Sequence, residues 1–149
     1  MTSPSLAREL ALRVLALESG ARARPEDAVA AAERVIELLH QHLARWFGGD
    51  GFHAILARAV DRARVEQPAL AAIRVVQQGE LHVEGLTEAA RAHDAETMHE
   101  ALVTLIASLL SLLGRLVGDD LVSRLTHQIW PAATPLDLRT TDTRTTRRE

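Results

Sequence analysis

A long apolar run in the second half of the chain limits the fold more than any other feature of the sequence. Between Glu100 and Arg115 lie 14 consecutive residues without a charge, ALVTLIASLLSLLG. A helix that spans a membrane needs about 18–20 such residues, so this run is short for a span and matches a buried helix better. The helical period extends from about residue 95 to residue 117, where Gly118 ends it. We therefore expect a buried helix and no membrane partner.

The predicted helix over 95–117 has three faces of different character. The first is a heptad-like row, named here the Leu stripe, with spacings of four, three, four, three and four: Met98, Leu102, Leu105, Leu109, Leu112 and Leu116. A second apolar row lies beside it: Ile106, Leu110, Leu113 and Val117. The third face carries only small residues, which allow another helix backbone to approach closely: Thr104, Ala107, Ser108 and Ser111.

Two arrangements can cover these faces. Other helices of the same chain can surround the apolar helix, or one of its faces can meet its own copy in a twofold homodimer. Only the helix predicted over about 26–47 is of similar length, and the other helices are short or rich in Ala. We therefore predict a homodimer that self-associates through the Leu stripe.

The rest of the chain is also mainly helical in its patterning. Apolar residues recur every three or four positions in three further segments, over about 5–18, 26–47 and 50–67, and again over 119–130. Asp50 and Asp94 are candidate N-caps, and the pair Gly48-Gly49 is a candidate helix end. These patterns predict an all-α bundle of four to five helices.

Between about residues 73 and 83 the apolar period shortens from about 3.6 to about 2, which is typical of strands. Ile73 and Val75 alternate with a polar residue, as do Leu81 and Val83. A three-residue loop, Gln77-Gln78-Gly79, pairs Val75 with Leu81 and Ile73 with Val83, and keeps the four apolar side chains on one face. We expect one small β-hairpin that packs on the helices, since two strands are not stable alone.

The chain of 149 residues has the length of one domain with one core. We assign residues 1–130 to a single helical domain. Residues 131–149 are rich in Thr and Arg with few apolar residues, so we expect a disordered C-terminal tail there. The formal net charge of −3 does not indicate a nucleic-acid partner. The N-terminus lacks the uninterrupted apolar core of a secretory signal, so we expect a cytoplasmic protein.

Four residue types are missing from the sequence, and several chemistries are excluded with them. The chain has no Cys, Lys, Tyr or Asn. Without Cys it has no disulfide, thiolate nucleophile or Cys-ligated zinc, and without Lys it has no Schiff base or Walker-A phosphate site. The G-x-S-x-G motif of a serine nucleophile is also absent. We therefore expect a protein without enzymatic activity and without a cofactor.

Two Glu-x-x-His units give the least favoured alternative, a metal-dependent enzyme. Glu37 with His40, and Glu96 with His99, have the spacing that directs two ligands inward in di-iron bundles. On a helical wheel, however, Glu96 lies about 160° from the centre of its apolar stripe and so points to solvent. A di-iron site also needs inward carboxylates from two further helices, and the carboxylates of those helices fall on polar faces.

An aromatic cluster near the Gly-rich segment gives a second alternative, a small ligand-binding or sensory bundle. Its pocket would lie between the hairpin and the helices and would be lined by Trp46, Phe47, Phe52 and His53. The scarcity of catalytic groups and the apolar surface of residues 98–130 favour a different function. We predict a helical protein-interaction or regulatory module, which dimerises and presents a surface to another protein.

Overall fold

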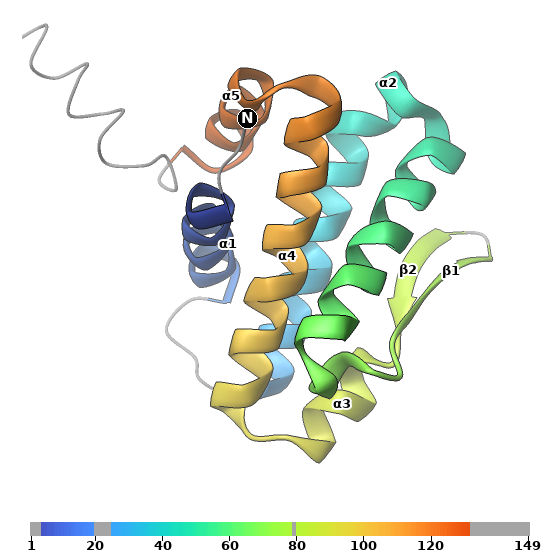
Figure 1. Cartoon of the computed structure of the whole chain (residues 1–149), viewed down its shortest axis with the longest axis vertical. Coiled ribbons are helices and arrows are strands. Elements are labelled where there is room, and N and C mark those ends of the chain that lie inside the picture. Colours follow the sequence, from blue (N-terminus) through green and yellow to red (C-terminus); the bar gives the residue numbers. More distant parts are fainter. Residues whose placement is uncertain (1–3, 20–24, 79, 132–149) are drawn as a thin grey trace, which may run out of the picture.

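A computed structural model describes residues 4–19, 25–78 and 80–131 of the chain (Figure 1). Its helices are α1 (Pro4–Ser19), α2 (Pro25–Glu66), α3 (Leu86–Ala92), α4 (Ala95–Val117) and α5 (Asp119–Ile129). A 3-10 turn, η1 (Pro68–Leu70), precedes the two antiparallel strands β1 (Arg74–Gln78) and β2 (Glu80–Glu84). The predicted all-α bundle with one small hairpin is confirmed. The tail predicted over 131–149 lies, after Pro131, outside the described residues and stays a prediction.

The long helix α2 consists of two arms joined at Gly48. This glycine has φ 73° and ψ 171°, a conformation that is almost confined to glycine. The chain reverses there, so the first arm, residues 25–47, and the second arm, residues 49–66, run antiparallel (Figure 1). The two arms are the two helices that the sequence predicts, with the turn at the predicted glycine pair.

The apolar helix α4 is the centre of the bundle. It lies against α1 and against both arms of α2, and α5 folds back from its end (Figure 1). All its Leu and Ile residues between Leu102 and Leu113 are at most 6% exposed. The helices of the chain itself therefore cover both apolar faces of α4. Of the two arrangements that the sequence allows, this is the one within a single chain.

α4 is also the one described helix that is long and apolar enough to cross a membrane. The mean hydropathy of its most apolar window is 1.8, and 61% of that window is buried inside the bundle. The core helix of a bundle and a membrane span share this length and composition, so hydropathy does not separate the two. In this structure α4 is the core helix.

The ends of α4 follow signals that are visible in the sequence. At its start, the backbone N–H of Thr97 donates a hydrogen bond of 2.8 Å to Oδ1 of Asp94, the predicted N-cap. Hydrogen bonds from the side chain and then from the backbone N–H of Thr97 lower the pKa of Asp94. At its end, Gly118 adopts φ 96° and leads directly into α5.

The hairpin forms where the sequence predicts it, but in a different register. Val75 pairs with Val83, and Gln77 pairs with Leu81. The predicted pairing of Val75 with Leu81 and of Ile73 with Val83 is therefore wrong by two residues. Because side chains alternate with a period of two, this shift leaves the same residues on the same face. Val83 is buried and Val75 packs against the core, and both strands contact α2.

Tertiary contacts of the residues around β1 explain the observed register. Ile73, which the prediction placed in the strand, belongs to the turn before it: its N–H donates to the Leu70 carbonyl at 3.1 Å. The carbonyl of Ile73 accepts a hydrogen bond of 3.0 Å from Nη1 of Arg64 in α2. The first ladder pair is then Arg74 with Glu84, whose Nη2 and Oε1 atoms are 3.2 Å apart. The prediction used only the length of the loop and the position of its glycine. It included neither the hydrogen bond from Arg64 nor the ion pair between Arg74 and Glu84.

Candidate functional site

The Leu stripe, predicted as the self-association surface, lies in the core of a single chain. Four of its members are 0% exposed and a fifth is 6% exposed: Met98, Leu102, Leu105 and Leu109, and then Leu112. Leu116, at 60%, is its one exposed member. Within one chain, α1 and the arms of α2 therefore cover surface that the prediction assigned to a second copy. The homodimer itself stays a prediction and needs another surface.

The four residues predicted to line a ligand pocket have different environments. Phe52 is fully buried and stacks on His40, with ring centroids 5.0 Å apart and an angle of 25° between the rings. Trp46 is 48% exposed, and His53 is half-buried. The side chain of Phe47 lies outside the described residues. Phe52 thus fills the core at the reversal of α2, which does not support the predicted pocket.

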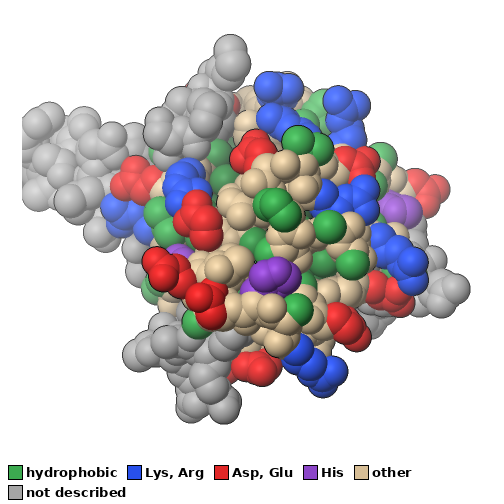
Figure 2. Space-filling view, turned by 60° about the horizontal axis from the view of Figure 1, so that its bottom comes forward, with side chains coloured by type: hydrophobic (Ala, Val, Ile, Leu, Met, Phe, Trp, Pro, Cys, Tyr) green, Lys and Arg blue, Asp and Glu red, His purple; other side chains and the backbone are tan. Residues whose placement is uncertain are grey.

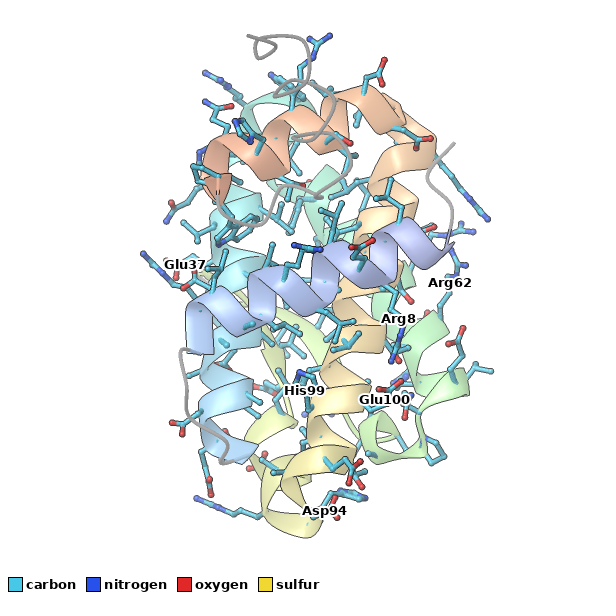
Figure 3. The ribbon with its side chains drawn as sticks, turned by 90° about the vertical axis from the view of Figure 1, so that its left-hand side faces the viewer. Arg8, Glu37, Arg62, Asp94, His99 and Glu100 are labelled. Atoms are coloured by element: carbon cyan, nitrogen blue, oxygen red, sulfur yellow. The ribbon has the colours of Figure 1, made fainter. Side chains whose placement is uncertain are left out.

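The two Glu-x-x-His units do not meet. Figure 3 shows Glu37 and His99 well separated, on α2 and α4. Glu37 lies 3.7 Å from the guanidinium of Arg34, and both Glu96 and His99 are exposed. Within residues 4–19, 25–78 and 80–131, no three His, Asp or Glu side chains are placed to hold a metal ion together. The described geometry therefore gives the di-iron hypothesis no support.

A cavity of about 240 Å³ opens instead along the third, small-residue face of α4. Its floor consists of the four residues of that face: Thr104, Ala107, Ser108 and Ser111. One wall is formed by Ala7 and Arg8 of α1, and the other by Arg62 and Glu66 of the second arm of α2. We call this cavity, with these eight lining residues, the α4 groove.

Polar contacts hold both walls of the α4 groove against its floor. From α1, Nη2 of Arg8 donates to both carboxylate oxygens of Glu100, at 2.7 and 2.6 Å (Figure 3). From the end of α2, Nε2 of Gln67 donates to Oγ1 of Thr104 at 3.0 Å. The Thr104 hydroxyl in turn donates to the Glu100 carbonyl at 3.0 Å. The groove therefore has fixed walls and is formed before anything binds in it.

The charges on the two walls differ in how they are satisfied. Arg8 is neutralised by Glu100, although both side chains remain partly exposed, at 42% and 47%. Across the groove, Arg62 and Glu66 are exposed and take part in no ion pair or side-chain hydrogen bond with any residue that the structure describes. Arg62 precedes Glu66 by four residues, and this order of charges is the less favourable one for a helical ion pair.

The end of the bundle that carries α3 differs from the α4 groove. On the face shown in Figure 2, hydrophobic side chains of the described residues appear as small areas between charged and polar ones. Glu88, Arg91 and Asp94 are exposed in this part of the fold. The described side chains of this face therefore form a mixed, solvated surface without a continuous apolar area.

The floor of the α4 groove is visible in the sequence pattern, whereas its walls are not. The period of α4 alone places Ala107, Ser108 and Ser111 on one face. Arg8, Arg62 and Glu66 carry no comparable signal, because each is one charged residue among many on an amphipathic helix. Their roles depend on which helices lie beside α4, and the sequence contains no local signal for that.

Comparisons with protein-family models, with curated proteins and with solved structures found no match to this chain. Residues cannot therefore be assigned roles by correspondence with a relative. The function has to be inferred from the contacts, charges and exposure of the residues described above.

Proposed function

We propose that the chain is a helical protein-interaction module without enzymatic activity, which docks a helix of another polypeptide in the α4 groove. One observation carries this proposal. The small-residue face of α4 is open, whereas α1 and α2 cover its two apolar faces. Small side chains let two helix axes approach closely, so this face suits a helix that the described part of the chain does not provide.

The dimensions of the α4 groove favour a protein partner over a small-molecule ligand. Pockets for drug-sized ligands have volumes of about 300–1,000 Å³ and enclose most of the ligand. The α4 groove, at about 240 Å³, is smaller and open to solvent. A helix in such a groove places side chains from successive turns into it, in the manner of helix-in-groove recognition.

The composition of the lining supports binding rather than catalysis. A serine nucleophile needs an adjacent base that is itself held in place, most often a histidine. Ser108 and Ser111 have no His beside them in the lining, which holds two guanidinium groups, one carboxylate and hydroxyl groups. Because the walls are held by Arg8 and Gln67, a partner also loses less free energy in ordering the site.

A photo-crosslinking experiment tests the proposal. The chain has no cysteine, so Ser108→Cys gives the full-length protein a single attachment point in the floor of the groove for a photoreactive alkyl diazirine, a label smaller than an indole. In extract of the source cells we expect this label to capture a polypeptide that the same label on Ala54→Cys, an exposed position of α2, does not capture. Capture should be lost when Ala107→Trp fills the groove and should survive Ala54→Trp.

Two results would contradict the proposal. Equal capture from positions 108 and 54 would mean that the partner does not bind in the groove. Capture that persists in a folded Ala107→Trp variant would show the same. If Ala107→Trp does not fold, as judged by circular dichroism, Ser111→Leu provides a smaller obstruction on the same face, with Ser123→Leu in α5 as its control.

A further inference from the structure

One wall of the α4 groove is complementary to itself. Arg62 and Glu66, which pair with no residue that the structure describes, lie four residues apart on the second arm of α2, so their Cβ atoms are about 6 Å apart on one side of the helix. A twofold axis that passes between two antiparallel copies of this arm places Arg62 of each copy opposite Glu66 of the other. This single symmetric contact forms two ion pairs, and each charge takes part in one of them.

An exposed apolar side chain lies beside this wall, outside the lining of the groove. Val65 precedes Glu66 directly and follows Arg62 by three residues, one turn along the helix. It is 84% exposed, the most exposed large hydrophobic residue in the described part of the chain. Val65 therefore flanks the two charges on the helix surface and offers a partner an apolar contact next to them.

The other wall is not available for such pairing. Arg8 already donates two hydrogen bonds to Glu100, so a partner would have to break this ion pair before it could use either charge. In Figure 3, Arg8 and Arg62 lie on the same side of the bundle, on different helices. When the second arm of a partner's α2 enters the groove, the charge on the α1 wall is therefore already paired. On the other wall, Arg62 and Glu66 can form ion pairs with the entering helix.

We infer that the helix docked in the α4 groove is the second arm of α2 from a second copy of this chain, in a twofold dimer with reciprocal Arg62–Glu66 ion pairs. This inference rests on the proposed function and names its partner. Each copy then fills the groove of the other, and the small residues of α4 face the partner's arm. The homodimer predicted from the sequence is retained, but its interface lies on α2 and the open face of α4 instead of the Leu stripe.

Charge reversal tests this pairing without any unknown component. The full-length Arg62→Glu and Glu66→Arg variants each bring like charges together across the twofold axis, twice per dimer. We expect the dissociation constant of each variant to rise about 2- to 30-fold, since an exposed ion pair contributes about 0.2–1 kcal/mol and two are lost. An equimolar mixture of the two variants restores both pairs in a heterodimer, so its dissociation constant should return toward that of the wild type.

Sedimentation velocity over a range of protein concentrations measures these constants. Arg45→Glu, a charge reversal on the exposed surface of the first arm of α2, is the control and should leave association unchanged. A wild type that stays monomeric at all concentrations would overturn the inference, as would a mixture that associates no better than the single variants. An effect of Arg45→Glu equal to that of Arg62→Glu would also overturn it, by showing a general effect of charge.

These results are distinguishable from failure of the proposed function. If the label at position 108 captures a different protein while the wild type stays monomeric, the groove is a docking site and only the identity of its occupant is wrong. If the wild type dimerises and is insensitive to both charge reversals, the dimer uses another surface. If the label captures nothing, the proposed function itself fails.

Discussion

The guanidinium of Arg8 in α1 and the carboxylate of Glu100 in α4 form an ion pair that links the two helices, with Nη2 at 2.7 and 2.6 Å from the two carboxylate oxygens. The residues are 92 positions apart in the sequence. The contact secures α1 at the edge of the α4 groove and so couples the stability of the N-terminal helix to the shape of the site.

Removing this ion pair should weaken the fold by a small, salt-dependent amount. Both side chains are partly exposed, so Arg8→Met, which keeps much of the apolar stem, should lower the free energy of unfolding by about 0.2–1 kcal/mol. Urea denaturation in low salt measures the difference from wild type, which should shrink in high salt because salt screens exposed charges. A loss that is the same at both salt concentrations would show that packing, not charge, holds α1.

Two residues of the Leu stripe should respond very differently to truncation. Leu109 is 0% exposed and Leu116 is 60% exposed. Leu109→Ala should lower the free energy of unfolding by about 2–5 kcal/mol through the loss of burial and the cavity left behind. Leu116→Ala, its matched control about two turns along the same stripe, should change it by at most about 0.5 kcal/mol. A large effect of Leu116→Ala that depends on protein concentration would place the stripe in an interface after all.

Gly48→Ala should destabilise the reversal of α2. A Cβ at this position meets nothing within 4 Å, so the cost comes from the positive φ of 73° rather than from a clash. Backbone strain of this kind lowers the free energy of unfolding by about 1–3 kcal/mol. Gly51→Ala, three residues later in a helical conformation, should instead raise it by up to about 1 kcal/mol. Thermal unfolding of both variants checks this, and equal effects would contradict the assignment of the turn to Gly48.

The N-cap of α4 should make stability depend on pH. Hydrogen bonds from Thr97 lower the pKa of Asp94 below the ordinary aspartate value of 3.8, whereas the unfolded chain keeps that value. The folded state therefore releases this proton more readily, so the stabilisation is fully present above pH 3.8 and is lost as the pH falls through the lower, folded pKa. Asp94→Asn also caps a helix but does not titrate.

Thermal unfolding of the wild type and Asp94→Asn across the acidic range measures this effect. The advantage of the wild type over the variant should decrease as the pH falls below 3.8. A difference in Tm that is constant with pH would mean that the charge on Asp94 contributes nothing to the cap.

Local signals account for the parts of the fold that the sequence predicts. The helical period, the glycines at positions 48 and 118, and the cap at Asp94 involve residues within about one turn of each other, so their effect can be read without knowledge of the rest of the chain. The hairpin was located by the same means. Its register was not, because Arg64 and Leu70 hold Ile73 out of the strand from elsewhere in the fold.

The sequence by itself determined which helices form, where they end and which face of each is apolar. The tertiary structure alone decided what each face meets: the chain's own helices cover the Leu stripe, and the face of Ala107 and Ser108 stays open. It also decided that Arg8 is paired and that Arg62 pairs with no described residue. The physical reason is one of range. Periodicity and capping act over a few residues, whereas helix pairing is chosen by the sum of many weak contacts between distant segments.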